Sequence, residues 1–389
     1  MISLKELKKL GTRTLPTSQY RPTYTEKITT WLNKKEIIII KGIRRSGKSH
    51  IMYQLIQNLP KDTVYYFNFE DYKFGNQRDI TLLENIIELR DKTKKTYFFF
   101  DEIQQIHGFE RWLRTWYDKE LPIKFIISGS NISLLAPQLA TILTGRNITY
   151  TIKPLSWKEA KDFTPLSFED YLVYGGFPEI LLEHDTQRKK EQLQQYLKDI
   201  IAKDILFKHN IQNPKLIESL LYFFITNPGT KISANKLGSQ LHIAKETAQK
   251  YLEAVKDTFL LFEVPYFSWS TKTKYIGNRA SKYYVIDNGF LTAVSLKKNT
   301  SALYENLVAI ALHDKEIVEQ LFYWQNGVEI DFITKQKAIQ VTANNQIPQR
   351  EIDAFKVFNE KHKNFAHIII TPNNTHNSIS LQKFLETIM

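Results

Sequence analysis

The sequence contains no cysteine, and it has no long uninterrupted run of apolar residues. The absence of cysteine excludes disulfides and zinc sites built on thiolates, and it fits a reducing compartment. The opening residues, MISLKELKKL, lack the apolar core of a signal peptide, and no segment approaches the length that spans a bilayer. We therefore expect a cytoplasmic protein without a membrane partner.

Acidic residues are scarce near the start of the chain, where residues 1–60 contain twelve Lys and Arg against three acids. Residues 231–290 contain nine against five, whereas residues 301–389 contain eight against ten. The net charge of +12 is therefore concentrated in two parts of the chain. It predicts either an anionic partner such as DNA or a solvated basic surface. The length of 389 residues favours about two to three domains.

A phosphate-binding pattern follows the short apolar run Ile37 to Ile40. The run is too short and too β-branched for a helix, so it predicts a buried parallel strand. The next residues, GIRRSGKS, match G-x-x-x-x-G-K-[ST], and a helix is expected from Ser49 to Asn58. In such a loop the backbone N–H groups surround phosphates, the lysine contacts the β- and γ-phosphates, and the serine binds Mg²⁺. The predicted ligands are ATP and Mg²⁺, and the candidate nucleotide-binding residues are Gly42, Ile43, Arg44, Arg45, Ser46, Gly47, Lys48, Ser49 and His50.

A second candidate element is the aromatic run Tyr97 to Phe100, which ends in Asp101 and Glu102. This pattern is typical of a central strand that brings carboxylates to the carboxyl edge of a sheet, where ligands bind. Asp101 is expected to hold Mg²⁺ through water, and Glu102 to orient and deprotonate the attacking water. An Asp-Glu pair alone would indicate only a turn, but its combination with the phosphate-binding pattern favours catalysis.

Two weaker candidates follow the predicted strand Lys124 to Ser128. Ser130 or Asn131 occupies a position where a polar residue can sense the γ-phosphate, although a simple turn explains these residues nearly as well. Arg146 would reach a phosphate as a finger or sensor, or it would be a surface arginine at the end of a helix.

The middle of the chain predicts a compact helical unit. Helices are expected at Lys215 to Thr226, Ile232 to Leu241 and Ala244 to Phe259, with the spacing of a helix-turn-helix. Two strand-like segments follow. The basic segment 271–274 (TKTK) and then Arg279 lie between them, as in the wing of a winged helix. Winged helices bind DNA through the third helix and the wing, or they mediate protein contacts. Glu246 and Glu253 on the outer face weaken the DNA interpretation.

The C-terminal part predicts an αβββαβ order of elements from Ala302 onward. Glu305 would lie on the first helix, Asp331 on the second strand and Gln340 on the third. These three residues would converge on one edge of a sheet.

Taken together, the motifs resemble a prokaryotic family of AAA-type ATP-binding proteins that are related to the archaeal ATPases. The matching stretches are GIRRSGKS, FFFDEIQ, IISGSN, LTGR, KPLSWKE, YLVYGGFPEI, YYVIDNGFL, YENLVAIAL and YWQNGVEIDFI. They span nearly the whole chain in the expected order. The resemblance implies ATP binding and hydrolysis rather than a particular biological role.

The C-terminal domain of unknown function in this family resembles restriction-endonuclease-like folds. Those folds need an acid on one strand and an acid-x-Lys on the next to bind Mg²⁺ and position water. Here Gln340-Val341-Thr342 stands at the second of these positions. An amide binds Mg²⁺ weakly and a threonine has no charge, and only Lys335 or Lys337 would remain as substitutes. We therefore expect a catalytically degenerate nuclease fold that is used for binding or packing.

The sequence thus predicts an α/β fold with four parts. Residues 1–153 would form a P-loop ATPase core with an N-terminal helix, residues 154–210 a helical lid, residues 211–298 a winged helix, and residues 299–389 the nuclease-like domain. The leading functional hypothesis is an ATP-driven switch or motor that moves DNA- or protein-binding modules. The alternatives are a nucleotide-gated DNA or protein adaptor with little hydrolysis, and an ATP-dependent nuclease. The partner and the oligomeric state stay open.

Overall fold

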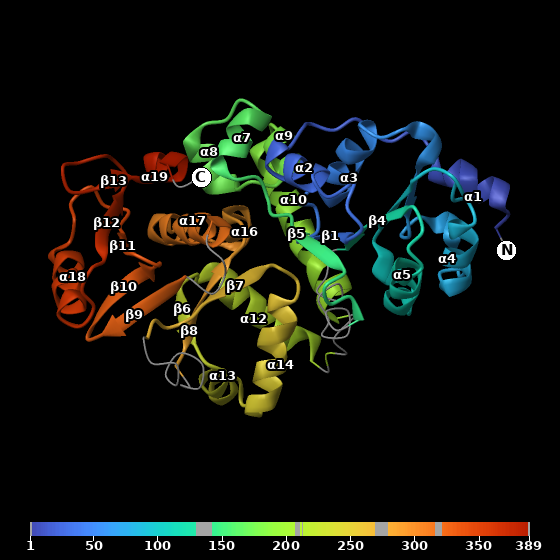
Figure 1. Ribbon diagram of the computed structural model, residues 1–389. Helices are drawn as coiled ribbons and strands as arrows, with labels where there is room; N and C mark the ends of the chain where they lie inside the picture. Colours follow the sequence, from blue (N-terminus) through green and yellow to red (C-terminus); the bar gives the residue numbers. More distant parts are fainter. Residues whose placement is uncertain are drawn as a thin grey trace. The chain divides into compact units, whose positions relative to one another are not determined.

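The computed structural model describes residues 2–129, 142–206, 211, 213–268, 279–315 and 321–387 (Figure 1). The candidates Ser130 and Asn131 and the basic residues 271–274 lie outside these ranges. The chain as described divides into two compact units, Met1–Lys153 and Pro154–Met389, which are called unit 1 and unit 2.

The described residues of unit 1 form a five-stranded parallel sheet with the order β2-β3-β4-β1-β5. The side chains of strands β1 to β4 are largely buried on both faces, because apolar and aromatic residues fill these strands as a covered parallel sheet requires. The sequence predicted β1, β3 and β4, and its aromatic run Val64 to Phe69 predicts β2 as well, whereas the edge strand β5 was not predicted. The strands are β1 (Ile37–Lys41), β2 (Val64–Asn68), β3 (Thr96–Asp101), β4 (Ile123–Gly129) and β5 (Asn147–Thr151).

Helices cover both faces of this sheet and form two apolar cores. Helices α1 (Leu4–Gly11), α4 (Ile80–Ile87) and α5 (Phe109–Asp118) contribute to the core on one face. Helices α2 (Pro22–Thr29) and α3 (Lys48–Gln57) contribute to the core on the other. Short 3-10 helical turns lie at Lys61–Thr63, Tyr72–Phe74 and Ile103–Gln105. The candidate site lies at the carboxyl ends of β1 and β3 and in the segments that follow them.

The first part of unit 2 is mainly helical. The long helix α10 (Thr186–Asp199) continues as a π-helix over Ile200–Leu206. A three-stranded antiparallel sheet with the order β6-β8-β7 is present in the described part of the following segment. The elements are α7 (Trp157–Phe163), α8 (Phe168–Tyr174), α9 (Pro178–Leu182), α10, α12 (Pro214–Thr226), β6 (Thr230–Ile232), α13 (Ala234–Leu241), α14 (Lys245–Lys256), β7 (Leu261–Val264), β8 (Ser281–Val285) and α16 (Asn288–Val294).

A buried carboxylate joins the end of α8 to α16. Asp287 caps α16 and accepts hydrogen bonds from the backbone N–H of Gly176, at 2.7 Å, and of Gly289, at 2.8 Å. Burial raises the pKa of Asp287 to about 7. A Cβ atom on Gly175, whose φ is +75°, would lie only 1.7 Å from an oxygen of Asp287. The segment that we expected to form a lid is therefore packed closely against the rest of unit 2.

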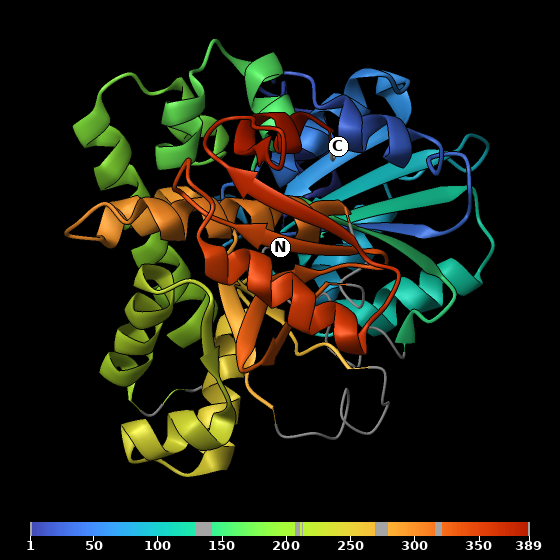
Figure 2. The same cartoon turned by 90° about the vertical axis from the view of Figure 1, so that its left-hand side faces the viewer.

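The described residues after α16 form a five-stranded mixed sheet with the order β13-β12-β11-β10-β9 (Figure 2). Strands β9, β10 and β11 are antiparallel, and β11, β12 and β13 are parallel. The predicted αβββαβ order is present, and β13 and α19 extend it. The elements are α17 (Thr300–Lys315), β9 (Phe322–Asn326), β10 (Val328–Ile333), β11 (Lys337–Val341), α18 (Gln349–Lys361), β12 (Ala366–Thr371), β13 (Ile379–Ser380) and α19 (Leu381–Thr387).

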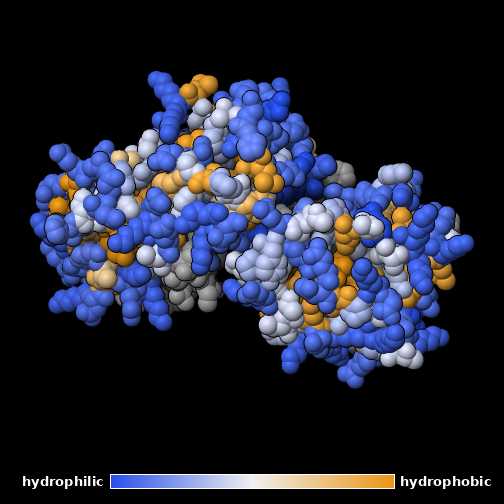
Figure 3. All heavy atoms as spheres, turned by 90° about the horizontal axis from the view of Figure 1, so that it is seen from above, coloured by the Kyte–Doolittle hydropathy of each residue, from blue (hydrophilic) through white to orange (hydrophobic). Residues whose placement is uncertain are grey.

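The surface carries many hydrophilic residues with apolar residues between them (Figure 3). Leu296 and Tyr72 are the most exposed of the large apolar side chains that the structure describes. Within the described ranges, no helix has both the length and the apolar character needed to cross a bilayer.

Candidate nucleotide-binding and catalytic site

The phosphate loop, Gly42 to Ser49, comprises the connection between β1 and α3 and the first two residues of α3, and its shape depends on two glycines. A Cβ atom on Gly42 would lie 2.0 Å from the carbonyl oxygen of Ile152, and φ at Gly42 is +142°. Gly47 has φ +95° and stands immediately before the first residue of α3. Both conformations are accessible to glycine and strained for other residues. A glycine-containing loop that leads directly into a helix N-terminus is a suitable arrangement for phosphate, because such loops offer backbone N–H groups to an anion.

Lys48 is buried within this loop. Its ammonium group donates hydrogen bonds to the carbonyl oxygens of Gly42, at 3.0 Å, and Ile43, at 3.2 Å. The lysine charge is thus held inside the loop whose backbone would surround the phosphates. Of the other candidate loop residues, Ile43 belongs to the buried apolar interior, and Arg44 forms an ion pair with Glu70 at 3.3 Å. The ring of His50 packs edge-on against Tyr53.

Ser46 provides a further polar group in the loop. Its hydroxyl is buried and has no hydrogen-bond partner among the residues that the structure describes. Buried hydroxyls are nearly always hydrogen-bonded, so an unpaired one beside a phosphate-binding loop is consistent with a phosphate or water partner.

Asp101 lies fully buried at the end of β3 and brings three strands together. Among the described residues, three hydroxyl groups donate hydrogen bonds to its carboxylate. Ser49 donates at 2.6 Å, Tyr66 of β2 donates at 2.5 Å, and Ser128 of β4 also donates. Burial raises the pKa of Asp101, and the neighbouring Glu102 raises it further, whereas the three hydroxyls lower it.

The donor set around Asp101 suits Mg²⁺. Hard oxygen ligands from a serine hydroxyl and a carboxylate are those that Mg²⁺ prefers beside a phosphate. Ser49 and Asp101 supply both groups next to the phosphate loop. The residues present therefore fit the metal that the loop pattern implies, and these two would hold it.

Glu102 follows β3 in an unusual backbone conformation. Its φ is +54°, in the left-handed region, which costs a non-glycine residue about 1–2 kcal/mol. Its backbone N–H donates to the Ser128 hydroxyl at 3.2 Å, and its carboxylate accepts a hydrogen bond from Gln104. Strained residues of this kind gather at functional sites. The position next to Asp101 is thus suited to the predicted catalytic base.

Arg146 is not brought to this edge of the sheet. It precedes β5, and its carbonyl accepts a hydrogen bond from the N–H of Ile37 at the start of β1. The phosphate loop follows the carboxyl end of β1, whereas Arg146 lies beside the amino end of the same strand. Its guanidinium pairs with Asp118 at 3.1 Å. The arrangement within one chain therefore favours the interpretation of Arg146 as a surface arginine.

Sequence reasoning missed three residues that contact the site. Tyr66 and Ser128 donate hydrogen bonds to Asp101, and Arg21 donates one to the backbone of the phosphate loop. The buried guanidinium of Arg21 donates to the carbonyl of Ser46 at 2.9 Å and to that of Lys153 at 3.3 Å. Ser128 ends a predicted strand beside β3, which is a usable signal. No local pattern marks Tyr66 or Arg21.

Tyr66 is a positioning residue that we expect to matter for the metal. In the Tyr66→Phe variant, loss of the hydroxyl should leave Asp101 less firmly oriented and lower Mg²⁺-dependent turnover about threefold to tenfold. The half-saturating Mg²⁺ concentration should rise as well, and a purely structural role would not change it. The matched control is Tyr65→Phe, because Tyr65 stacks on Phe98 in the other core. An unchanged Mg²⁺ dependence in Tyr66→Phe would contradict this role.

The C-terminal candidates converge only in part. Glu305 and Asp331 both contact the ammonium group of Lys282, at 3.1 and 3.5 Å. Gln340 instead bonds to backbone, because its amide accepts from the N–H of Asp331 and donates to the carbonyl of Glu329. No cluster of His, Cys, Asp and Glu in the described part of the chain has an arrangement that could hold a metal ion.

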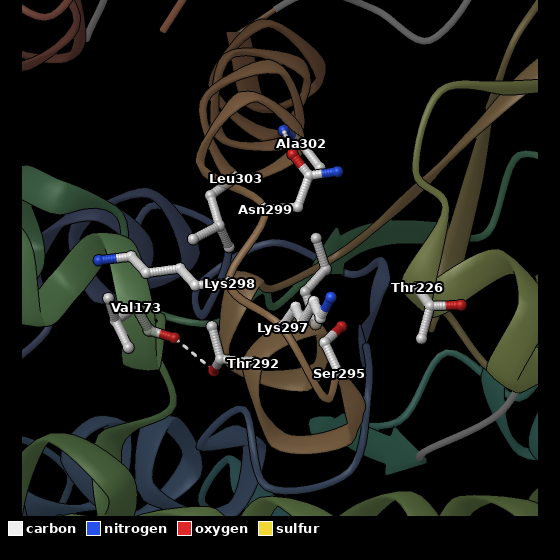
Figure 4. Close-up of a pocket in the computed structure, with 10 residues that line it drawn as sticks. Val173, Thr226, Thr292, Ser295, Lys297, Lys298, Asn299, Ala302 and Leu303 are labelled. Atoms are coloured by element: carbon white, nitrogen blue, oxygen red, sulfur yellow. Dashed lines mark hydrogen bonds between the residues drawn. The ribbon is translucent and has the colours of Figure 1, made fainter.

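A separate pocket in unit 2 contains none of these candidates (Figure 4). In it the Thr292 hydroxyl donates to the carbonyl of Val173 at 2.7 Å, so α8 and α16 meet there. The lining is completed by Thr226, Leu291, Ser295, Lys297, Lys298, Asn299, Ala302 and Leu303.

The parallel sheet and the phosphate loop of unit 1 are those of a P-loop core of the AAA type. Residues 34–161 match the family described as "AAA domain", and residues 166–301 match a domain of unknown function, DUF8612. The parallel sheet and the phosphate loop lie within the first match, whereas Arg21, which binds the loop, precedes it.

Two known proteins resemble this chain along most of its length. An uncharacterized protein of Methanocaldococcus jannaschii is 33% identical over 351 residues, which are 82% of this chain and 78% of the relative. An uncharacterized protein of Haemophilus influenzae is 27% identical over 379 residues, 90% of this chain and 92% of the relative. The chain belongs to the same protein family as the Methanocaldococcus jannaschii protein.

Two solved structures show weaker likeness. The Aeropyrum pernix Orc1 protein in complex with DNA is 8% identical, covers 72% of this chain and 93% of its own, and has a TM-score of 0.32. AMPPCP-bound DnaA from Aquifex aeolicus is 14% identical, covers 64% and 91%, and has a TM-score of 0.30. At these TM-scores the likeness carries no argument about function.

Proposed function

We propose that the protein binds ATP and hydrolyses it in a Mg²⁺-dependent reaction, and that binding and hydrolysis rearrange the modules of unit 2. The observation that carries this proposal is the hydrogen bond of 2.6 Å between the Ser49 hydroxyl and Asp101. It brings the two expected metal ligands together at the carboxyl edge of the sheet. Lys48 lies in the same loop, and Glu102 follows Asp101 directly.

Each residue has a distinct task in this reaction. Lys48 would leave the carbonyl oxygens of its own loop and bind the β- and γ-phosphates, where its charge stabilises the transferred group. Ser49 and Asp101 would hold Mg²⁺, which when bound neutralises charge on the phosphate oxygens. Glu102 would accept the proton of the attacking water. The hydroxyls of Tyr66 and Ser128 keep Asp101 in place throughout.

The direct test is steady-state ATP hydrolysis by the full chain and by its Lys48→Ala variant. The variant should lose ATP binding or turnover, with a fall in kcat/KM of about 10²-fold or more, because the charge that contacts the β- and γ-phosphates is removed. Lys61→Ala is the matched control, since Lys61 is an exposed lysine of the same unit. Equal turnover by Lys48→Ala and the wild type would refute the assignment.

A second candidate function is a nucleotide-gated adaptor for DNA. The order α12-β6-α13-α14-β7-β8, with the sheet β6-β8-β7, is that of a winged helix and supports this candidate. Lys236, Lys245 and Lys250 are exposed on α13 and α14. The same hydrolysis assay with duplex DNA distinguishes a DNA partner from a protein partner, because stimulation that fades with salt would make DNA an effector. Hydrolysis that is indifferent to DNA would favour a protein partner.

A further inference from the structure

An ammonium group occupies the centre of the acidic cluster in unit 2. Lys282 of β8 is only 2% exposed, and its Nζ atom lies 2.6 Å from Glu329, 3.1 Å from Glu305 and 3.5 Å from Asp331. These acids come from α17 and β10, so within the described residues one lysine meets carboxylates from two other elements. The rings of Tyr323 and Phe332 lie 5.7 and 5.9 Å from the same ammonium group.

The carboxylates are also held in position by other donors. Glu305 accepts a hydrogen bond from the Tyr284 hydroxyl at 2.7 Å, and Asp331 accepts one from the N–H of Val341 at 2.9 Å. Glu329 contacts Lys231 with its second oxygen. Each acid around Lys282 is therefore also held by a second donor.

The pKa values of Lys282 and Asp331 show how the lysine and the surrounding acids affect one another. Burial alone would lower the pKa of Lys282, but the surrounding anions, with Glu305 the strongest, hold it well above its usual value. Burial raises the pKa of Asp331 to about 7, and Lys282 acts against that rise. The lysine is consequently cationic at neutral pH and offsets the negative charge of three acids, of which Glu305 and Glu329 are partly exposed.

We propose that the ammonium group of Lys282 is a built-in cation that takes the place of a metal ion between Glu305, Glu329 and Asp331. In this position it excludes divalent cations and holds the β6-β8-β7 sheet and α17 to the C-terminal sheet. Divalent cations bind oxygen ligands at about 2.0–2.6 Å, so a metal ion could enter only if the lysine left. Gln340 is not available as a ligand, because its amide is bonded to the backbone at Asp331 and Glu329.

As they stand around Lys282, the three acids form no metal site. The proposal predicts that such a site appears only when the ammonium group is removed and the acids close on the space that it leaves. In the Lys282→Met variant of the full chain, one additional Mn²⁺ should bind relative to the wild type, as measured by titration calorimetry without nucleotide after EDTA treatment. The melting temperature of the variant should fall by about 5–10 °C, because breaking a buried ion pair leaves charges uncompensated. Mn²⁺ should restore part of this loss in the variant and leave the melting temperature of unit 2 in the wild type unchanged.

Two further variants make the test specific. The double variant Lys282→Met/Asp331→Asn should lose the additional Mn²⁺, because one of its oxygen ligands becomes an amide. The matched control is Lys231→Met, which removes the other lysine on Glu329 and leaves Lys282 in place. This control should bind no additional Mn²⁺. Gain of Mn²⁺ by Lys231→Met, or no gain of Mn²⁺ by folded Lys282→Met, would overturn the proposal.

A comparison of two proteins that both keep Lys282 tests the proposal even if Lys282→Met does not fold. Wild-type protein and Asp331→Asn should bind Mn²⁺ with the same stoichiometry, since the proposal leaves no metal on Asp331. Loss of a bound Mn²⁺ in Asp331→Asn would show that the wild-type cluster is a metal site, and the inference would be wrong. Neither outcome depends on ATP turnover, so failure of this inference and failure of the proposed ATPase function are distinguishable.

Discussion

Replacement of Glu102 by glutamine is expected to lower the rate of ATP hydrolysis by about 10²–10⁴-fold while ATP remains bound. The amide keeps the size of the side chain but cannot accept a proton from water. Lys48, Ser49 and Asp101 are unchanged in this variant, so the phosphates and Mg²⁺ retain their ligands. Steady-state hydrolysis and equilibrium ATP binding, measured on the same preparation, would show a collapse in kcat with an affinity within a few-fold of the wild type.

The control for this experiment is Glu26→Gln, which changes an exposed acid of unit 1 outside the site. It should leave both measurements unchanged. The comparison also separates the two leading functions, because a pure adaptor that hydrolyses almost no ATP has little rate to lose. If Glu102→Gln hydrolyses ATP as fast as the wild type, Glu102 is not the catalytic base.

The second large effect concerns the stability of unit 2. In Gly175→Ala, the new Cβ atom would lie 1.7 Å from Asp287 at a position with φ +75°. The clash and the backbone strain together should destabilise unit 2 by at least about 3 kcal/mol, because Asp287 cannot move without losing its hydrogen bonds to Gly176 and Gly289. Thermal or urea unfolding would show this loss.

Gly327→Ala provides a matched control, since Gly327 has φ +73° in the same unit and no atom lies within 4 Å of the position that its Cβ atom would take. This substitution introduces the backbone strain without the clash, so it should lower the free energy of unfolding by only about 1 kcal/mol. Similar losses of stability in the two variants would show that Asp287 is not a rigid contact. ATP binding by unit 1 serves as the internal check that only unit 2 is affected.

The sequence predicted the parts of the site that depend on local patterns. The phosphate loop is contiguous, and Asp101 ends an apolar run, so the meeting of Ser49 with Asp101 follows from parallel strands that share one carboxyl edge. The contact from Tyr66 was not predictable in this way. The β2 residue that faces Asp101 depends on the sheet register and on the side to which each side chain points.

Other misses have a similar physical origin. Helix α1 is short and rich in lysine, and its Leu7 becomes buried only when it packs on the sheet. Lys282 lies in the strand Ser281–Val285, where nothing in the neighbouring residues marks a buried charge. Its partners Glu305 and Asp331 are far away in sequence. The sequence predicted that Glu305 and Asp331 would come together, but it predicted neither Glu329 nor the cation between the three acids.

Arg21 gives the phosphate loop a mechanical link to the end of unit 1. Its guanidinium holds the carbonyl of Ser46 and that of Lys153, the last residue before unit 2 begins. A rotation of the Ser46 peptide during nucleotide exchange would have to carry Lys153 with it or break a buried, charge-assisted hydrogen bond. A single side chain thus links the position of the phosphate loop to the point where the polypeptide leaves the P-loop core.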